Sequence, residues 1–253
     1  MWYEMSILKK ISPFEKKDLL IAWIALAIAF TIALFSRGGL VTLISQAVGG
    51  NFTGINGQML LIAFVASLII VGLSFILHEM AHKFTAIKYG YWAEFRKSNP
   101  MLVISVCVAV LLGVVFAAPG ATMINTAGRQ MSKKESGIIS VAGPLTNIVL
   151  LVVFAALMIA GIILGGGEIY ASGIAFSFTG AGFLFYLGYS GWMVNAMLAF
   201  FNMLPVGPLD GKKILRWNPV VFLVIIALSF FLLYIPFDSG MMLSIVNFFV
   251  PMA

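Results

Sequence analysis

Long runs without any charged residue are the strongest constraint on what this chain can fold into. No Asp, Glu, Lys or Arg occurs in residues 19–36, 59–77, 136–167, 169–209 or 217–237. A helix needs about 20 apolar residues to cross a hydrocarbon layer ~30 Å thick. Only 9% of the chain is charged, whereas soluble domains carry about 25%. The sequence therefore predicts an all-α polytopic membrane protein with about five to six transmembrane helices.

The positive charges predict how these helices are oriented. Cytoplasmic loops of membrane proteins are enriched in Lys and Arg. The clustered basic residues are Lys9, Lys10, Lys16, Lys17, Lys83, Lys88, Arg96, Lys97, Arg129, Lys133, Lys134, Lys212, Lys213 and Arg216. All of them lie on one side if the N-terminus is inside and the runs cross alternately. We therefore expect a multi-pass protein of the cell membrane with a cytoplasmic N-terminus.

Two segments do not fit a simple crossing. Residues 98–128 are uncharged but are interrupted by Pro100, Gly113 and Pro119. In the predicted topology they must enter and leave on the same side or cross twice, and we expect a re-entrant hairpin with β-like backbone. Residues 239–253 are short for a crossing, so whether they span the membrane stays open.

Some classes of function and site are excluded by composition. Cys107 is the single cysteine, which rules out an intramolecular disulfide and a cysteine-based zinc site. Basic residues do not alternate with exposed aromatic residues along a stripe, so we expect no nucleic-acid partner.

The two histidines of the chain form an H-E-x-x-H pattern, from His78 to His82. On a helix, residues i and i+4 lie on one face, where two imidazoles can bind one Zn²⁺. Glu79 then lies beside the metal as a general base. Ionisable groups in membrane helices are rare and usually functional. This pattern directly follows a run of 19 uncharged residues, 59–77. The sequence therefore predicts a zinc site here.

A catalytic zinc ion usually takes a third protein ligand and keeps one open position. Most acidic residues lie before the first run, among basic residues, or on the opposite side in the predicted topology. Asp210 lies on the same side as the histidine pair, after a run that Pro205, Gly207 and Pro208 would break as a helix. Asp210 is therefore the candidate third ligand, although chemistry alone also allows a solvated Asp after a helix end.

Several motifs resemble the site-2 protease family of intramembrane metalloproteases. His78-Glu79-x-x-His82 resembles the zinc motif of that family, and Asn202-x-x-Pro205-x-x-x-Leu209-Asp210-Gly211 resembles its second motif. Residues 143–147, Gly-Pro-Leu-Thr-Asn, resemble a third element, and residues 116–120 resemble a loop of the compact archaeal-type members. The resemblance covers residues 59–215 and marks them as the catalytic core of one membrane domain, 1–253. Residues 1–58 then form an N-terminal helix and loop, and residues 216–253 form C-terminal helices.

The resemblance implies a role for each matched residue. His78, His82 and Asp210 would bind one zinc ion, and Glu79 would activate water. Asn202 would bind the substrate backbone or the developing oxyanion, whereas Asn147 would pack and hydrogen-bond near the site. The implied activity is hydrolysis of peptide bonds within or near transmembrane segments of membrane-anchored proteins, with the active site opening to the cytoplasm.

Other functions fit the same residues less well. A non-proteolytic membrane zinc-binding protein or transporter is the main alternative, but it would need more ligands along a path. A zinc protease with a downstream Glu ligand would have to use Glu168, on the opposite side in the predicted topology. Ser190 invites a serine-protease interpretation, but both histidines already belong to the zinc motif. The substrate, the gate and the oligomeric state are not determined by the sequence.

A helical substrate must unwind before it can be cut, because its peptide bonds are otherwise enclosed. Residues 91–96 and 114–121 combine aromatic or β-branched residues with Gly and Pro breaks. We therefore expect one of these segments to offer a strand edge that holds the substrate extended.

Overall fold

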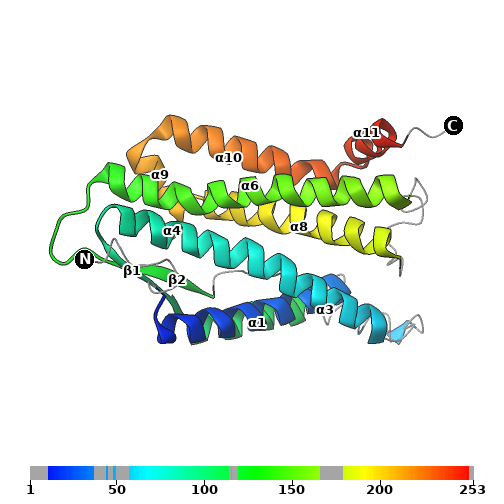
Figure 1. The fold of residues 1–253 in the computed structure, drawn as a ribbon, viewed down its shortest axis with the longest axis horizontal. Helices are drawn as coiled ribbons and strands as arrows, with labels where there is room; N and C mark the ends of the chain where they lie inside the picture. The colour runs from blue at the N-terminus through cyan, green and yellow to red at the C-terminus, as the bar shows by residue number, and fades with distance from the viewer. Residues whose placement is uncertain are drawn as a thin grey trace. The chain divides into compact units, whose positions relative to one another are not determined.

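The computed structural model describes residues 11–36, 44, 48–49, 57–113, 115, 119–165 and 179–250. The chain divides into an N-terminal unit, Met1–Gln130, and a C-terminal unit, Met131–Ala253; Figure 1 shows their helices and strands. Most of the loop predicted before the second run, together with Glu168, lies outside the described residues.

Among the described residues, the helical part of the N-terminal unit consists of α1, α3, the helix that carries the histidines, and α5. α1 covers Pro13–Ser36 and contains the first predicted span, residues 19–36. α3 (Gly57–Val71), the π-helical segment η2 (Gly72–Ile76) and α4 (Leu77–Lys88) follow one another without a break. α1 packs against both α3 and α5 (Asn99–Leu112).

A two-stranded antiparallel sheet completes this unit (Figure 1). β1 (Trp92–Lys97) pairs with β2 (Gly120–Asn125), so that Trp92 lies opposite Asn125 and Lys97 opposite Gly120. The strand expected at residues 91–96 is therefore confirmed. Of the alternative segment, residues 114–121, only the end belongs to a strand, and positions 114 and 116–118 lie outside the described residues.

Helix α5 leaves the end of β1, and the chain then comes back to the sheet. The Ser98 backbone N–H donates to the Pro119 carbonyl oxygen at 2.7 Å, so both ends of the intervening segment lie together. α5 has 14 residues and is about 21 Å long, which is less than the ~30 Å hydrocarbon layer. This geometry favours the predicted re-entrant hairpin over two crossings.

The described residues of the C-terminal unit contain helices and turns but no strand. It contains α6 (Lys133–Gly165), α8 (Gly180–Asn202), α9 (Asp210–Trp217), α10 (Pro219–Tyr234), the short 3₁₀ segment η3 (Ile235–Phe237) and α11 (Ser239–Phe249). A capping box begins α6: the Ser132 backbone N–H donates to the Glu135 carboxylate, and the Glu135 backbone N–H donates to the Ser132 hydroxyl. Asn218 and Asp238 are the N-caps of α10 and α11. The side chain of each accepts from backbone N–H groups of the helix that it precedes.

Helices α6 and α8 run side by side at a distance that only glycine permits (Figure 1). A Cβ atom on Gly188 would lie 2.2 Å from the Met158 backbone nitrogen. On Gly191 it would lie 2.1 Å from the Phe154 ring. Small residues at such positions let helices in membranes approach closely, because association there relies on packing contacts.

Four helices among the described residues are long and apolar enough to cross a membrane. They are Leu60–Lys88, Lys133–Gly165, Gly180–Asn202 and Pro219–Phe237. The predicted all-α polytopic membrane architecture is therefore confirmed, and it includes a small two-stranded sheet. α11 has 11 residues and is about 16 Å long, so it is too short to cross by itself.

Candidate metal centre

Two histidine rings share one face of α4. His78 and His82 are one helical turn apart, and their Nε2 atoms lie 3.0 Å from each other. Their rings meet edge to face, with centroids 4.7 Å apart. Both side chains are buried, with exposed fractions of 4% and 7%. The sequence prediction that these rings face one another is therefore met within the N-terminal unit.

This nitrogen pair suits a zinc ion. Zinc binds imidazole nitrogens at about 2.0–2.1 Å in tetrahedral geometry, which places two ligand nitrogens about 3.3 Å apart. The separation of 3.0 Å between the two Nε2 atoms is close to that value. Facing ring nitrogens repel each other unless a proton or a cation lies between them. The two imidazole nitrogens and the distance between them therefore fit a zinc ion whose coordination further ligands would complete.

A π-helical segment immediately precedes the histidines. η2 covers Gly72–Ile76, and π segments inside longer helices occur often at functional sites. The Trp23 indole N–H, from α1, donates to the Leu68 carbonyl oxygen at 2.8 Å. This backbone oxygen next to the π turn therefore has a hydrogen-bond donor. A Cβ on Gly72 would lie 3.0 Å from the Trp23 ring nitrogen. This π-helical segment was not predicted from the sequence, where a glycine within an apolar run is its one local signal.

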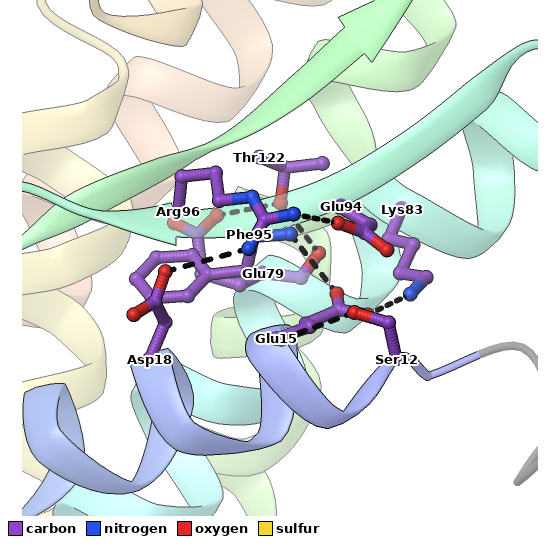
Figure 2. Close-up of polar contacts among 9 residues, drawn as sticks. All are labelled: Ser12, Glu15, Asp18, Glu79, Lys83, Glu94, Phe95, Arg96 and Thr122. Atoms are coloured by element: carbon purple, nitrogen blue, oxygen red, sulfur yellow. Dashed lines mark hydrogen bonds and ion pairs between the residues drawn. The ribbon is translucent and has the colours of Figure 1, made fainter.

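The Glu79 carboxylate is held by a residue from β2. The Thr122 hydroxyl lies 2.8 Å from Glu79 Oε2 and 3.2 Å from the Glu79 carbonyl oxygen. Figure 2 shows the Thr122 side chain extending from the strand toward Glu79. Glu79 itself is buried, at 8% exposed. Thr122 was not predicted as a partner of Glu79, because the two residues are 43 positions apart in the sequence.

A buried ion pair ties α1 to the helix that carries the histidines. Lys83 Nζ pairs with Glu15 Oε2, and both side chains have an exposed fraction of 0%. Glu15 Oε1 also accepts a hydrogen bond from the Phe95 backbone N–H at 2.9 Å, so the same carboxylate holds β1 (Figure 2). The Ser12 hydroxyl accepts from the Glu15 backbone N–H and caps α1. One carboxylate therefore connects α1, α4 and β1.

Lys83 has a buried position that the sequence did not predict. The sequence places it among the clustered basic residues that predict the cytoplasmic side. Lys83 is in fact buried and paired with Glu15, and α4 continues to Lys88. A lysine can be buried where a carboxylate compensates its charge, so its position in sequence did not mark the surface.

The break predicted before Asp210 is present in the C-terminal unit. α8 ends at Asn202, and Asp210 is the first residue of α9. Gly207 in the intervening turn has a φ of +54°, a left-handed conformation that glycine adopts at little cost. A Cβ on Gly211 would lie 2.0 Å from the Met203 carbonyl oxygen. The glycine after Asp210 therefore lets α9 begin directly against the end of α8.

Two asparagines of the motifs lie in the same unit. The Asn202 side-chain amide donates to the Leu198 carbonyl oxygen of its own helix at 2.9 Å. Asn147 in α6 is completely buried, and its amide donates to the Asn195 side-chain oxygen in α8 at 2.9 Å. The expected packing and hydrogen-bonding role of Asn147 agrees with this contact, and Asn195 was not found from the sequence. A role for Asn202 toward substrate stays a prediction.

Comparison with known proteins identifies the family. The family model described as "Peptidase family M50" matches residues 66–218, which is more than half of the chain. The chain belongs to peptidase family M50, the site-2 protease family. It is also 34% identical over 208 residues to a Methanocaldococcus jannaschii protein named "Putative zinc metalloprotease", covering 82% of this chain and 99% of that protein. No solved structure matches the chain.

Membership of family M50 gives the coarse function. The chain is a zinc metalloprotease, and its apolar helices make it a membrane protein. The range that matches the M50 family contains every residue predicted for the site, namely His78, Glu79, His82, Asn202 and Asp210.

Proposed function

We propose that this M50 peptidase is an intramembrane protease that hydrolyses peptide bonds within or near transmembrane segments of membrane-anchored proteins. The observation that carries the proposal is the buried histidine pair beside Glu79, near the end of the membrane-length helix Leu60–Lys88. Ionisable groups in such helices are costly, and they mark functional sites.

His78, His82 and Asp210 are the residues that would hold one zinc ion. Two imidazoles and a carboxylate leave a fourth position open, as catalytic zinc requires. Asp210 is buried, begins α9 after the helix break and lies within the range matched by the family. When bound, the zinc ion polarises the scissile carbonyl and makes water nucleophilic near neutral pH.

Glu79 would act as the general base. Its carboxylate takes a proton from the attacking water and later delivers it to the leaving amine, so no covalent intermediate with the protein is needed. The Asn202 amide would donate to the substrate backbone or to the developing oxyanion, a contact worth about 3 kcal/mol in other proteases. For this, it must exchange its present hydrogen bond to Leu198.

The substrate would lie extended along the sheet of the N-terminal unit. Among the described residues, β2 pairs with β1 alone, and an unpaired strand edge can accept the backbone of an unwound peptide. β2 is the strand that contacts Glu79, so a peptide along it would pass close to the general base. Replacing residues 91–96 and 120–125 with helix formers should abolish cleavage; intact cleavage would exclude this mode of binding.

The site is proposed to open to the cytoplasm, together with the N-terminus. Support comes from the basic clusters, since Lys and Arg are enriched in cytoplasmic loops. A reporter fused to the N-terminus should resist protease added outside intact cells. A reporter that is digested there would reverse the proposed orientation.

The decisive experiment uses the full chain purified in detergent. Its zinc content is measured, and cleavage of a membrane-anchored substrate is followed with and without a chelator. Glu79→Gln should retain zinc and lose cleavage, because it keeps the shape of the side chain but removes the base. Equal cleavage by Glu79→Gln would remove Glu79 from the mechanism. A zinc-loaded wild type without cleavage would favour a binding protein.

Two comparisons sharpen this result. Asp210→Asn should lose zinc, whereas Asp238→Asn, which alters an exposed helix cap in the same unit, should retain it. A substrate with its cleavage sequence in a transmembrane helix should be cut in preference to the same sequence in a soluble peptide. The reverse preference would contradict intramembrane cleavage and leave the zinc protease activity unaffected.

A further inference from the structure

The contact between Thr122 and Glu79 suggests a role for a residue outside the zinc motif. A hydroxyl carries one proton, and here it faces two acceptors on Glu79. The carboxylate oxygen Oε2 is the nearer, at 2.8 Å against 3.2 Å for the backbone oxygen. Hydrogen bonds to ionised acceptors are stronger than those between neutral groups. The hydroxyl proton is therefore expected to lie on the carboxylate.

We propose that Thr122 is a positioning residue for the general base. Its hydroxyl holds Oε2 and so fixes the rotation of the Glu79 carboxylate, the group that takes the proton from water. A glutamate side chain loses much rotamer freedom on being fixed. Catalytic groups have to be held within a few tenths of an ångström to act efficiently. This inference rests on the proposed role of Glu79.

The sheet and α1 hold Thr122 in place. Thr122 lies opposite Phe95 in the antiparallel register, and the Phe95 backbone N–H donates to Glu15. Glu15 in turn pairs with Lys83, one turn beyond Glu79 on α4. The sheet and α4 are thus joined twice, through Thr122 on β2 and through Glu15, which binds both β1 and Lys83 (Figure 2).

Gly120 permits the register that brings Thr122 to this position. A Cβ there would lie 2.3 Å from the Arg96 carbonyl oxygen, which is far inside normal contact distance. The paired strands therefore approach each other closely at Gly120, two residues before Thr122.

The test compares two substitutions in the full zinc-loaded chain. Thr122→Val keeps the shape but removes the donor, and Thr122→Ser keeps the donor. Thr122→Val should lower kcat at least about 10-fold, a part of the 10²–10⁴-fold that a general base contributes. Its KM and zinc content should stay within about twofold of wild type, because neither substrate binding nor the metal ligands change. Thr122→Ser should restore most of kcat. Thr31→Val is the matched control, because the Thr31 hydroxyl donates to the Ala27 carbonyl oxygen within α1.

A second readout does not depend on activity. The carboxylate stretching band of Glu79, identified in infrared spectra by subtraction of Glu79→Gln, should shift in Thr122→Val and keep its position in Thr31→Val.

The outcomes separate this inference from the proposed function. If Glu79→Gln abolishes cleavage but Thr122→Val shows an unchanged kcat and an unshifted band, the inference is overturned and the proposed function stands. Equal losses in Thr122→Val and Thr122→Ser, or loss of zinc in both, would assign Thr122 a packing role and also overturn it. If Glu79→Gln cleaves as well as wild type, the proposed function itself fails.

Discussion

The N-terminal and C-terminal units hold their helices together by different means. In the N-terminal unit, buried charges and hydrogen bonds link α1, α4 and the sheet, with Glu15 as the common partner. In the C-terminal unit, α6 and α8 meet through glycines that allow backbone contact. Directional bonds fix where single side chains point, whereas close packing fixes how far apart helices lie. The unit that carries the general base is the one built on directional bonds.

Loss of the Glu15 carboxylate should have the largest effect. In Glu15→Ala the Lys83 ammonium stays buried without this counter-charge, and breaking a buried pair in this manner costs about 3–5 kcal/mol. We expect a much lower unfolding midpoint in detergent and a lower zinc content. Glu135→Ala, which removes an exposed capping carboxylate, should cost about 1 kcal/mol or less.

A double substitution tests whether the charge itself is responsible. Glu15→Leu together with Lys83→Met should recover most of the stability, because apolar replacements of buried ion pairs are often neutral or stabilising. A double variant as unstable as Glu15→Ala would show instead that the hydrogen bond to the Phe95 backbone dominates.

A methyl group in the helix interface should have the next largest effect. Gly188→Ala places Cβ against the Met158 backbone, so the two helices must separate, and overpacking of this kind costs about 1–3 kcal/mol. Gly180→Ala at the start of the same helix meets nothing within 4 Å and should leave the unfolding midpoint unchanged. Similar midpoints for the two variants would argue that glycine packing does not determine the α6–α8 distance.

The buried Asn147–Asn195 contact should contribute less. It is a directional bond inside the unit that otherwise relies on packing. Side-chain hydrogen bonds within membranes are worth about 0.6 kcal/mol on average and up to about 1.7. A double-mutant cycle with Asn147→Ala and Asn195→Ala should give a coupling energy in that range. A coupling as large as the Glu15 effect would remove the contrast between the units.

The smallest effect should come from the pH dependence of α11. The Met241 backbone N–H and then the Tyr234 hydroxyl stabilise the Asp238 carboxylate, which lowers the pKa of Asp238 below its ordinary value. Its stabilising effect is therefore complete above the unfolded-state pKa of about 4 and disappears as pH falls through the lowered folded-state pKa. Hydrogen exchange of α11 amides should differ between wild type and Asp238→Ala at pH 6. That difference should shrink toward pH 3, and a constant difference would mean that the charge is irrelevant.

Features set by local pattern could be predicted from the sequence. The uncharged runs predicted the spans, and the i, i+4 spacing predicted that the His78 and His82 rings meet. The Pro and Gly residues before Asp210 predicted the helix break. Lys83 shows the limit of this reasoning, because its buried pairing with a carboxylate 68 positions away could not be predicted from local pattern.

From the sequence alone, this chain is predicted to enter a membrane, to place two imidazoles and a carboxylate on one helix, and to begin a second motif after a broken helix. These properties follow from hydropathy and from the fixed period of the α-helix, which act over a few residues. The contact of Thr122 with Glu79, and the link that Glu15 makes between Lys83 and β1, follow instead from the three-dimensional packing. Those partners are 43, 68 and 80 positions apart, and at such separations packing of whole elements, not local periodicity, selects which polar groups meet.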